Sequence, residues 1–217
     1  ASTFIGAIIR IGENNLFLSL VLTMLTCLVL GMGIPTIPNY IITSSLAGPA
    51  LLELGVPLLV SHMFVFYFGI MADLTPPVAL ACFAAAPMAK TSGLRISIQA
   101  TKLATAGFVV PFMAVYTPAL MLQDGGPMAE AWGYWVEVAY IVFKACAGIA
   151  LWGVAVVGFL FDRATWWERL ACFAAGVLLV LALPITDEAG FALGAAVVAA
   201  HWWRTRGRTG RPEPAAP

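Results

Sequence analysis

Residues 69–90 read GIMADLTPPVALACFAAAPMAK, which places an Asp, a Thr and two adjacent prolines inside an apolar stretch. A carboxylate is costly at membrane depth, and paired prolines remove two backbone donors from a helix. Irregular backbone at that depth is tolerated only where it is buried in protein or lines a water-filled site. An upstream run, GMGIPTIP at residues 31–38, offers a second break of this kind. Two broken apolar segments point to the substrate or ion site of a transporter.

The composition indicates an all-α polytopic membrane protein. The chain is 61% hydrophobic and 10% charged, with a mean hydropathy of +0.94. A soluble domain carries roughly 25% charged residues. The four cysteines are far apart in apolar runs and lack metal-ligand spacing, which indicates small core residues. The chain opens on Ala and runs directly into helical sequence, so we expect one half of a longer polypeptide.

The first part of the chain, residues 1–122, is expected to form a transport core. The arms at 16–30 and 36–50 are each shorter than the roughly 20 residues of a straight span, so a re-entrant hairpin or a broken span fits them equally. The expected pieces begin with a hairpin at 16–50 and a connector at 51–55. A broken helix follows at 56–90, with halves at 56–72 and 78–88. The last piece is a span at 96–122, kinked at Pro111 and Pro118.

The second part, residues 123–203, is expected to be a C-terminal extension of about three transmembrane helices. These helices are predicted at 134–160, 166–183 and 191–203, with a tight polar turn at 186–188. The tail at 204–217 is basic and rich in Gly and Pro, and it is predicted to be disordered.

Charges alternate between the predicted connections. The basic segments are Lys90, Arg95 and Lys102, then Arg163 and Arg169, then the arginines from Arg204 onward; the acidic ones are Asp124 and Glu130, then Asp187 and Glu188. By the positive-inside rule the basic segments and the C-terminus are cytoplasmic. Six tryptophans fall at predicted helix ends, as in the aromatic belt of a membrane protein.

Hard oxygen donors gather at the second break. The prolines leave carbonyls near Ala72 without intrahelical donors. Together with the Thr75 hydroxyl and the Asp73 carboxylate, these carbonyls suit a small hard cation. Pro76 and Pro77 are tolerated in the first turn of the following helix, whose N-terminus carries a partial positive charge.

The first break offers similar groups, with flexible glycines at Gly31 and Gly33 followed by the Thr36 hydroxyl and the Asn39 amide. Three further hydroxyls lie one to two turns on and could face the same cavity: Thr43, Ser44 and Ser45. The candidate ligands for such a cation are Gly31, Thr36, Asn39, Ala72 and Thr75.

Plainer interpretations apply to several of these residues. A single proline break is as often a kink as a site. His62, eleven residues before Asp73, suits a proton relay or, more simply, a hydrogen-bonded packing role. An intramembrane enzyme using His62 and Asp73 would need a second acidic or nucleophilic partner at that depth, which the sequence does not offer. Glu53 is expected to be solvated, and Glu137 and Lys144 to be interfacial or paired. No nucleotide-binding loop or hydrolase motif is present.

Residues 31–91 resemble the large permease subunit of TRAP transporters, the tripartite ATP-independent periplasmic carriers. Two elements carry this resemblance: Gly-x-Gly-x-Pro-Thr at 31–36 and Leu-Thr-Pro-Pro-Val at 74–78. The resemblance covers roughly residues 1–120 and is strongest for the fused-permease branch that pairs with TAXI-type binding proteins. The segment from Trp132 onward looks like the extra C-terminal spans of some fused permeases.

The resemblance implies one repeat of an inverted-repeat, elevator-type, sodium-coupled carrier in the bacterial inner membrane. It implies import of a small organic acid, with no enzymatic activity and no cofactor beyond the coupling sodium. The implied partners are a periplasmic substrate-binding protein, a small permease subunit or its fused equivalent, the missing first repeat and the lipid bilayer, with no nucleic acid.

By resemblance, the ion and substrate residues are Gly31, Gly33, Thr36 and Asn39 in the first element and Thr75, Pro76 and Pro77 in the second. Related permeases often carry an acidic residue in the first element, where this chain has Pro35 and Thr36. Asp73 receives no role from the family. Three alternatives remain: a tripartite tricarboxylate-type carrier, a proton-coupled carrier using Asp73, and a structural membrane subunit.

Overall fold

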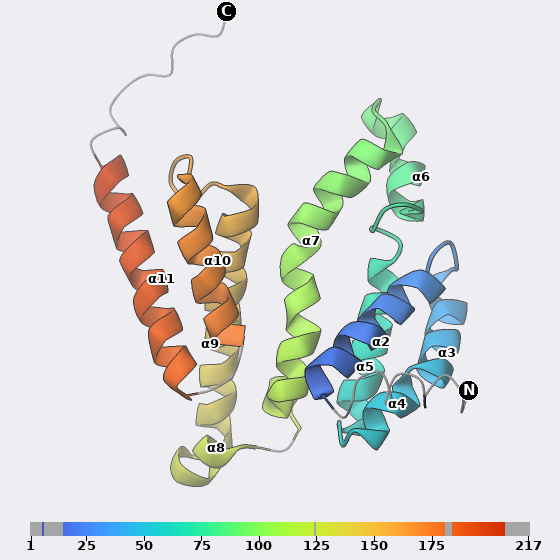
Figure 1. Ribbon diagram of the computed structural model, residues 1–217, viewed down its shortest axis with the longest axis horizontal. Helices are drawn as coiled ribbons and strands as arrows, with labels where there is room; N and C mark the ends of the chain where they lie inside the picture. The colour runs from blue at the N-terminus through green and yellow to red at the C-terminus, as the bar shows by residue number, and fades with distance from the viewer. Residues whose placement is uncertain (1–5, 7–14, 124, 181–183, 207–217) are drawn as a thin grey trace, which may run out of the picture. The chain divides into compact units, whose positions relative to one another are not determined.

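The computed structural model describes residues 6, 15–123, 125–180 and 184–206, which form helices joined by short turns (Figure 1). Within these ranges no strand occurs, and one isolated bridge pairs Phe159 with Arg163. The predicted all-α class is therefore confirmed. The chain divides into two compact units, Ala1–Val142 and Phe143–Pro217.

The first unit begins with two short helices around the first break. Helix α2 (Leu16–Leu30) starts at Asn15, whose side-chain oxygen accepts a hydrogen bond from the Leu18 amide at 3.2 Å. Helix α3 (Thr36–Leu46) follows the turn. Gly33 has a φ of +75° in this turn, a conformation that glycine adopts without strain. The predicted arm at 16–30 and the predicted start at residue 36 agree with these helices.

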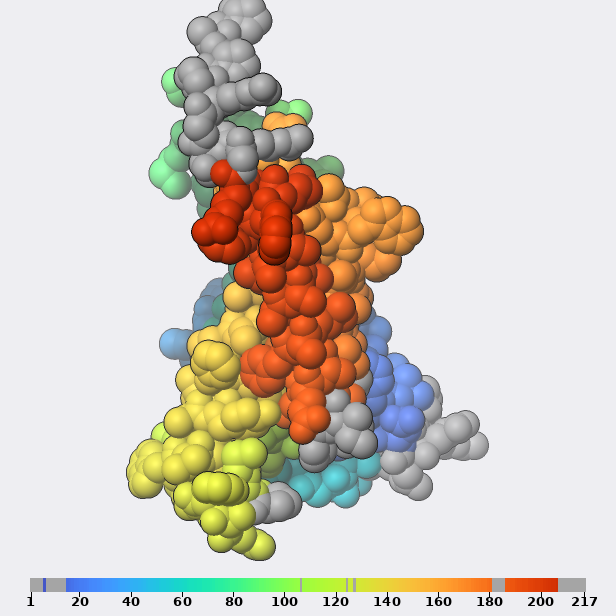
Figure 2. Space-filling model, turned by 90° about the vertical axis from the view of Figure 1, so that its left-hand side faces the viewer, coloured from blue at the N-terminus to red at the C-terminus, as the bar shows by residue number. Residues whose placement is uncertain are grey.

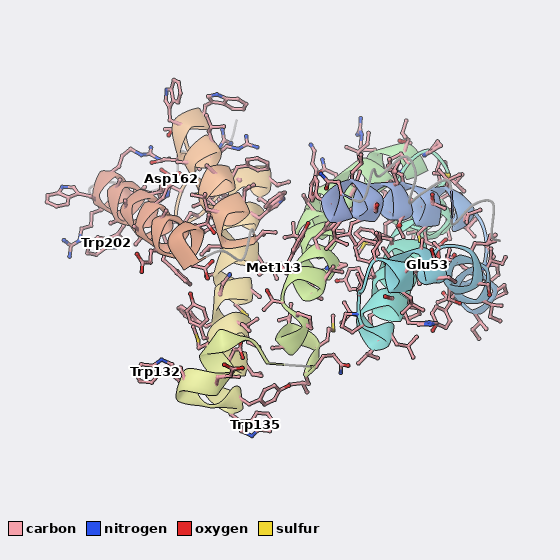
Figure 3. All side chains as sticks on the ribbon, turned by 60° about the horizontal axis from the view of Figure 1, so that its bottom comes forward. Glu53, Met113, Trp132, Trp135, Asp162 and Trp202 are labelled. Carbon is pink, nitrogen blue, oxygen red and sulfur yellow. The ribbon has the colours of Figure 1, made fainter. Side chains whose placement is uncertain are left out.

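Helix α4 (Gly48–Glu53) replaces most of the expected connector at 51–55. Pro49 lies in its first turn, where the missing proline N–H has no intrahelical partner to lose. The arm predicted at 36–50 is therefore divided, because α3 ends at Leu46 and a new helix starts at Gly48. Glu53 is exposed, as expected (labelled in Figure 3).

Helices α5 (Leu58–Met71) and α6 (Leu80–Ala89) flank the second break. Helix α7 (Gly93–Tyr116) starts three residues earlier than predicted, because the Ser92 hydroxyl caps it through the Arg95 amide at 3.3 Å. Pro111 lies inside α7. Pro118 instead begins the separate 3₁₀ turn η1 (Pro118–Met121), so the predicted single span at 96–122 is two elements.

Helix α5 is the centre of the first unit. Helices α2, α3, α4 and α7 all pack against it. The aromatic rings of Phe64 and Phe68 lie 5.4 Å and 5.8 Å from the Phe112 ring of α7, measured between centroids. Leu20 of α2 is fully buried in the same core. This packing holds the C-terminal end of α5, where the second break begins.

The connection after η1 contains helix α8 (Pro127–Trp132), which leads into α9 (Tyr134–Val157). Trp132 and Trp135 are about three-quarters exposed and project outward from the ribbon (Figure 3). The Glu137 carboxylate accepts the Gly126 amide at 2.9 Å and 3.0 Å, so this connection is tied to the start of α9.

The second unit contains the rest of α9 with α10 (Trp166–Val180) and α11 (Pro184–Thr205), seen in yellow, orange and red in Figure 2. Its core joins residues of all three helices. A Cβ at Gly176 would lie 3.4 Å from the carbonyl oxygen of Gly148, so small residues allow α9 and α10 to approach closely.

Two predictions for the second unit were wrong at the residue level. The polar turn expected at 186–188 is part of the first turns of α11, because Pro184 starts that helix and Asp187 suits its N-terminus. Arg204 and Thr205, expected in the tail, belong to α11, and Thr205 is buried. The rest of the expected tail, from residue 207, lies outside the described residues.

Among the described residues, α7 and α9 are the helices long and apolar enough to cross a membrane by length and composition. Helices α2, α5 and α6 are apolar and shorter.

Candidate functional site

The two breaks lie against each other, and Asn39 joins them. Its side-chain Nδ2 donates a buried 2.7 Å hydrogen bond to the carbonyl oxygen of Gly69, in the last turn of α5. A Cβ at Gly31 would lie 2.7 Å from both Asn39 Nδ2 and Gly69 O, and 2.8 Å from the Ala72 Cβ. Only glycine fits there without displacing backbone. The ends of α2 and α5 are therefore in direct contact at this point.

A second close approach lies further along both breaks. A Cβ at Gly33 would be 3.8 Å from the Val78 side chain, just after the two prolines. The two turns are thus also in van der Waals contact at this point. This arrangement brings residues about forty positions apart in sequence to one place.

The carbonyl groups at the end of α5 find local partners. Met71 O accepts both the Thr75 amide at 3.1 Å and the Thr75 hydroxyl at 2.7 Å. Leu74 O accepts the Thr101 hydroxyl of α7 at 3.3 Å. Asp73 O accepts the Ala81 amide at 3.2 Å, which attaches the turn to α6. The break is a compact, hydrogen-bonded turn, and its Thr75 hydroxyl is committed to Met71.

Two side-chain oxygens at the breaks are buried without a hydrogen-bond partner. They are Asn39 Oδ1 and Asp73 Oδ1. Asn39 as a whole is only 1% exposed. Leaving a buried polar group unpaired costs about 1–3 kcal/mol, and more for a charged group. Oxygens of this kind are the groups that a bound cation satisfies.

The other predicted site residues lie in less buried positions. Gly33, Thr36 and Pro77 are exposed, and Pro76 is half-buried. Thr43 is buried and donates to Asn39 O at 2.9 Å, which supports the backbone of that residue. Ser44 and Ser45 instead donate to Ile41 O of their own helix and lie toward the outside.

His62 has a hydrogen-bonded packing role rather than an isolated position. Its Nδ1 lies 2.8 Å from the Tyr40 hydroxyl, which joins α5 to α3. The His62 and Tyr40 rings also meet edge to face, with centroids 6.1 Å apart.

The sequence analysis missed a buried ion pair in the second unit. Lys144 Nζ of α9 lies 2.7 Å and 2.8 Å from the two carboxylate oxygens of Asp187 in α11. The two residues are 4% and 8% exposed. Asp187 was expected in a tight polar turn. Its position in helix α11 is what places it opposite a residue of α9.

A polar cluster at the start of α10 was also missed. Glu168 Oε2 accepts the Thr165 amide at 2.7 Å, lies 3.1 Å from His201 Nδ1 and pairs with Arg204 Nη2 at 2.8 Å. The spacing Thr165-x-x-Glu168 is that of a capping box, which is the signal that could have found it. His201 had been given no role.

A family model matches residues 2–128, which is more than half of the 217-residue chain: the Tripartite ATP-independent periplasmic transporter, DctM component. The matched region contains both breaks and all of the helices around them. The protein is thus a membrane-embedded transporter permease, and it belongs to this DctM family. The resemblance to the large permease subunit of TRAP transporters is confirmed. Searches of curated proteins and of solved structures gave no match.

Proposed function

We propose that this chain provides the ion- and substrate-binding repeat of a sodium-coupled permease that imports a small organic acid. The contact between Gly31, Asn39 and the end of α5 supports this proposal most directly. It joins two interrupted apolar segments in one buried, polar place, as expected for the binding region of a broken-helix carrier.

Sodium would bind to the oxygens at the two breaks. The unpaired amide oxygen of Asn39 and the backbone near Gly31 and Ala72 are neutral hard donors, and the Asp73 carboxylate lies in the same turn as Ala72. Bound sodium satisfies oxygens that are otherwise desolvated at a cost. It therefore lowers the cost of carrying the binding region through the apolar phase.

The transported solute would be a carboxylate. Helices α3 and α6 both begin next to a break, and neither has a side-chain N-cap. The dipoles of both helices, together with the first N–H groups of α3, favour an anion at this place. A sodium ion beside it adds further attraction, so ion and acid bind together.

The family name describes a tripartite transporter, and the partners follow from that description. A periplasmic substrate-binding protein would deliver the acid, and a small permease subunit or its fused equivalent would complete the membrane part. A first, inverted repeat would complete the site, with elevator-type movement of the loaded region. We assign the chain to the fused branch that pairs with TAXI-type binding proteins, in the bacterial inner membrane with a cytoplasmic C-terminus.

Thermal unfolding of the full-length parent transporter tests sodium binding. Purified protein in detergent is melted in sodium chloride and in choline chloride at matched ionic strength. Sodium at about a hundredfold over its dissociation constant stabilises the folded state by roughly 2.7 kcal/mol. The stabilisation should disappear in Asn39→Ala. Ser45→Ala is the matched control, because Ser45 lies on the outer side of the same helix and bonds only to Ile41 O.

A proton-coupled carrier is the second candidate, because one Asp73 oxygen is buried and unpaired. In that case the melting temperature is the same in both salts. The melting temperature rises when the pH is lowered, and Asp73→Asn abolishes this rise. A response to neither ion would favour a structural membrane subunit.

A further inference from the structure

A second polar contact joins α3 to α5 beside the Asn39 amide. The Tyr40 hydroxyl lies 2.8 Å from His62 Nδ1. The Tyr40 ring also stands nearly perpendicular to the Phe66 ring, at 89° with centroids 5.5 Å apart. Tyr40 is thus fixed to α5 both by its hydroxyl and by its ring.

The position of this contact relates it to Asn39. Asn39 and Tyr40 are neighbours on α3, and their partners Gly69 and His62 are seven residues apart on α5. Seven residues are close to two helical turns, or about 10 Å along the axis. Two contacts at this separation fix both the position and the rotation of α3 against α5.

The orientation of Asn39 leaves little tolerance. A Cβ at Gly31 would meet the amide nitrogen at 2.7 Å, and one at Gly69 would meet the amide oxygen at 3.1 Å. A small rotation of α3 would therefore break the bond to Gly69 or move the unpaired oxygen away from its present place. Since α3 has eleven residues and a proline start without a side-chain cap, its own backbone does not hold it firmly.

The chemistry of the pair argues for a positional role. A histidine and a tyrosine hydroxyl within apolar helices carry a desolvation cost that leucine and phenylalanine would avoid. Apolar side chains would pack as well but would not select one rotation. A hydrogen bond is directional, so this pair selects one rotation of α3.

We propose that the Tyr40–His62 pair is a positioning latch for the ion site: it holds α3 so that the Asn39 amide oxygen faces the two breaks. The proposal rests on the sodium coupling proposed above. Tyr40 and His62 act through Asn39 and do not contact the ion themselves. They set the affinity for sodium rather than the rate of transport once sodium is bound.

Sodium activation of uptake tests the latch. The full transporter, with its binding protein, is reconstituted in liposomes, and the initial rate of uptake is measured against external sodium at saturating acid. Tyr40→Phe keeps the ring against Phe66 and removes the hydroxyl. We expect about a five- to tenfold higher half-saturating sodium concentration, with an unchanged maximal rate.

Two further variants separate the hydrogen bond from packing. His62→Asn keeps a side-chain acceptor at the position of Nδ1 and should stay close to wild type, whereas His62→Leu should match Tyr40→Phe. Because the two residues act as one pair, the double variant Tyr40→Phe/His62→Leu should be no worse than either single variant. Tyr67→Phe is the control, since it makes the same change on α5 outside the latch.

The outcomes are distinct. A wild-type transporter without sodium activation overturns the sodium coupling and the latch together. A sodium-activated wild type with an unchanged half-saturating concentration in Tyr40→Phe overturns the latch alone. A lower maximal rate with the same sodium dependence would show a purely structural role and also overturn it. If Tyr40→Phe does not fold, the difference between His62→Asn and His62→Leu decides.

Discussion

Gly31 is the residue with the least freedom in the candidate site. Its missing Cβ leaves room for the Asn39 amide, the Gly69 carbonyl and Ala72 at the same time. The Gly69 carbonyl and the Ala72 Cβ are fixed by the backbone at the end of α5, and the Asn39 side chain is short. None of the three can therefore move aside cheaply. The residue type at this position is therefore set by contact between α2 and α5, and not by backbone φ.

Gly31→Ala should destabilise the transporter by about 1–3 kcal/mol, the usual range for overpacking, and remove the stabilisation by sodium. Melting curves in sodium chloride and choline chloride measure both effects. Gly48→Ala is the matched control, because a Cβ at Gly48 meets nothing within 4 Å. Sodium-dependent stabilisation of Gly31→Ala equal to that of wild type would contradict the assigned site.

Glu168 joins α10 to α11 in the second unit. It caps α10 through Thr165 and pairs with both His201 and Arg204 of α11. Glu168→Ala removes these bonds together and should cost about 1–3 kcal/mol in the free energy of unfolding. Glu188→Ala, an exposed change in the first turns of α11, is the comparison. Equal melting temperatures for the two variants would show that the cluster contributes little.

At the scale of helices, the ion pair between α9 and α11 determines how these two elements meet. Lys144→Met leaves the Asp187 carboxylate in an apolar environment without its ammonium partner and should cost about 3–5 kcal/mol. The double variant Lys144→Met/Asp187→Leu should recover most of this loss, because an apolar pair has no desolvation cost. Thermal unfolding in detergent compares the variants. A double variant less stable than Lys144→Met would contradict this account.

The sequence predicted helices well where local signals mark their ends. Asn15 marks the start of α2, and the glycine and proline runs mark both breaks. The prediction was less successful at prolines, because proline interrupts a helix but is also favoured in the first turn of one. The arm predicted to run to residue 50 ends earlier, and the stretch predicted as a connection between residues 183 and 191 is helical, because Pro49 and Pro184 each lie in the first turn of a helix. Pro118 was taken as a kink and instead separates two elements.

The same difference applies to side chains. Residue type alone predicted that Gly31, Asn39 and Ala72 belong to one candidate site, and the structure brings these three together. The sequence could not show that Thr75 bonds back to Met71 or that Thr36 is exposed. The exposure of Thr36 depends on which face of α3 meets α5, and the Thr75 bond depends on how the turn after α5 folds. Likewise, Tyr40 meets His62 only because α3 and α5 pack side by side.

For the whole molecule, the structure changes which charges bear on orientation in the membrane. Asp187 pairs with Lys144, and Arg169 donates to Ala155 O and Val156 O at the end of α9. Neither charge therefore counts as part of an exposed connection in the positive-inside rule. Exposed basic residues remain at Lys90 and Arg95 around the α6–α7 turn and at Arg206 after α11. Glu130 and the exposed Trp132 mark the connection before α9.

These remaining charges predict a cytoplasmic C-terminus and an external connection around α8 by the positive-inside rule. Fusions in the full-length transporter test the prediction. Green fluorescent protein after Arg206 should fluoresce, because it folds in the cytoplasm, and alkaline phosphatase inserted after Gly125 should be active, because it folds only outside. The reciprocal fusions are the controls and should both be silent. The reverse pattern would contradict the predicted orientation, and Lys90 and Arg95 would then lie on the external side.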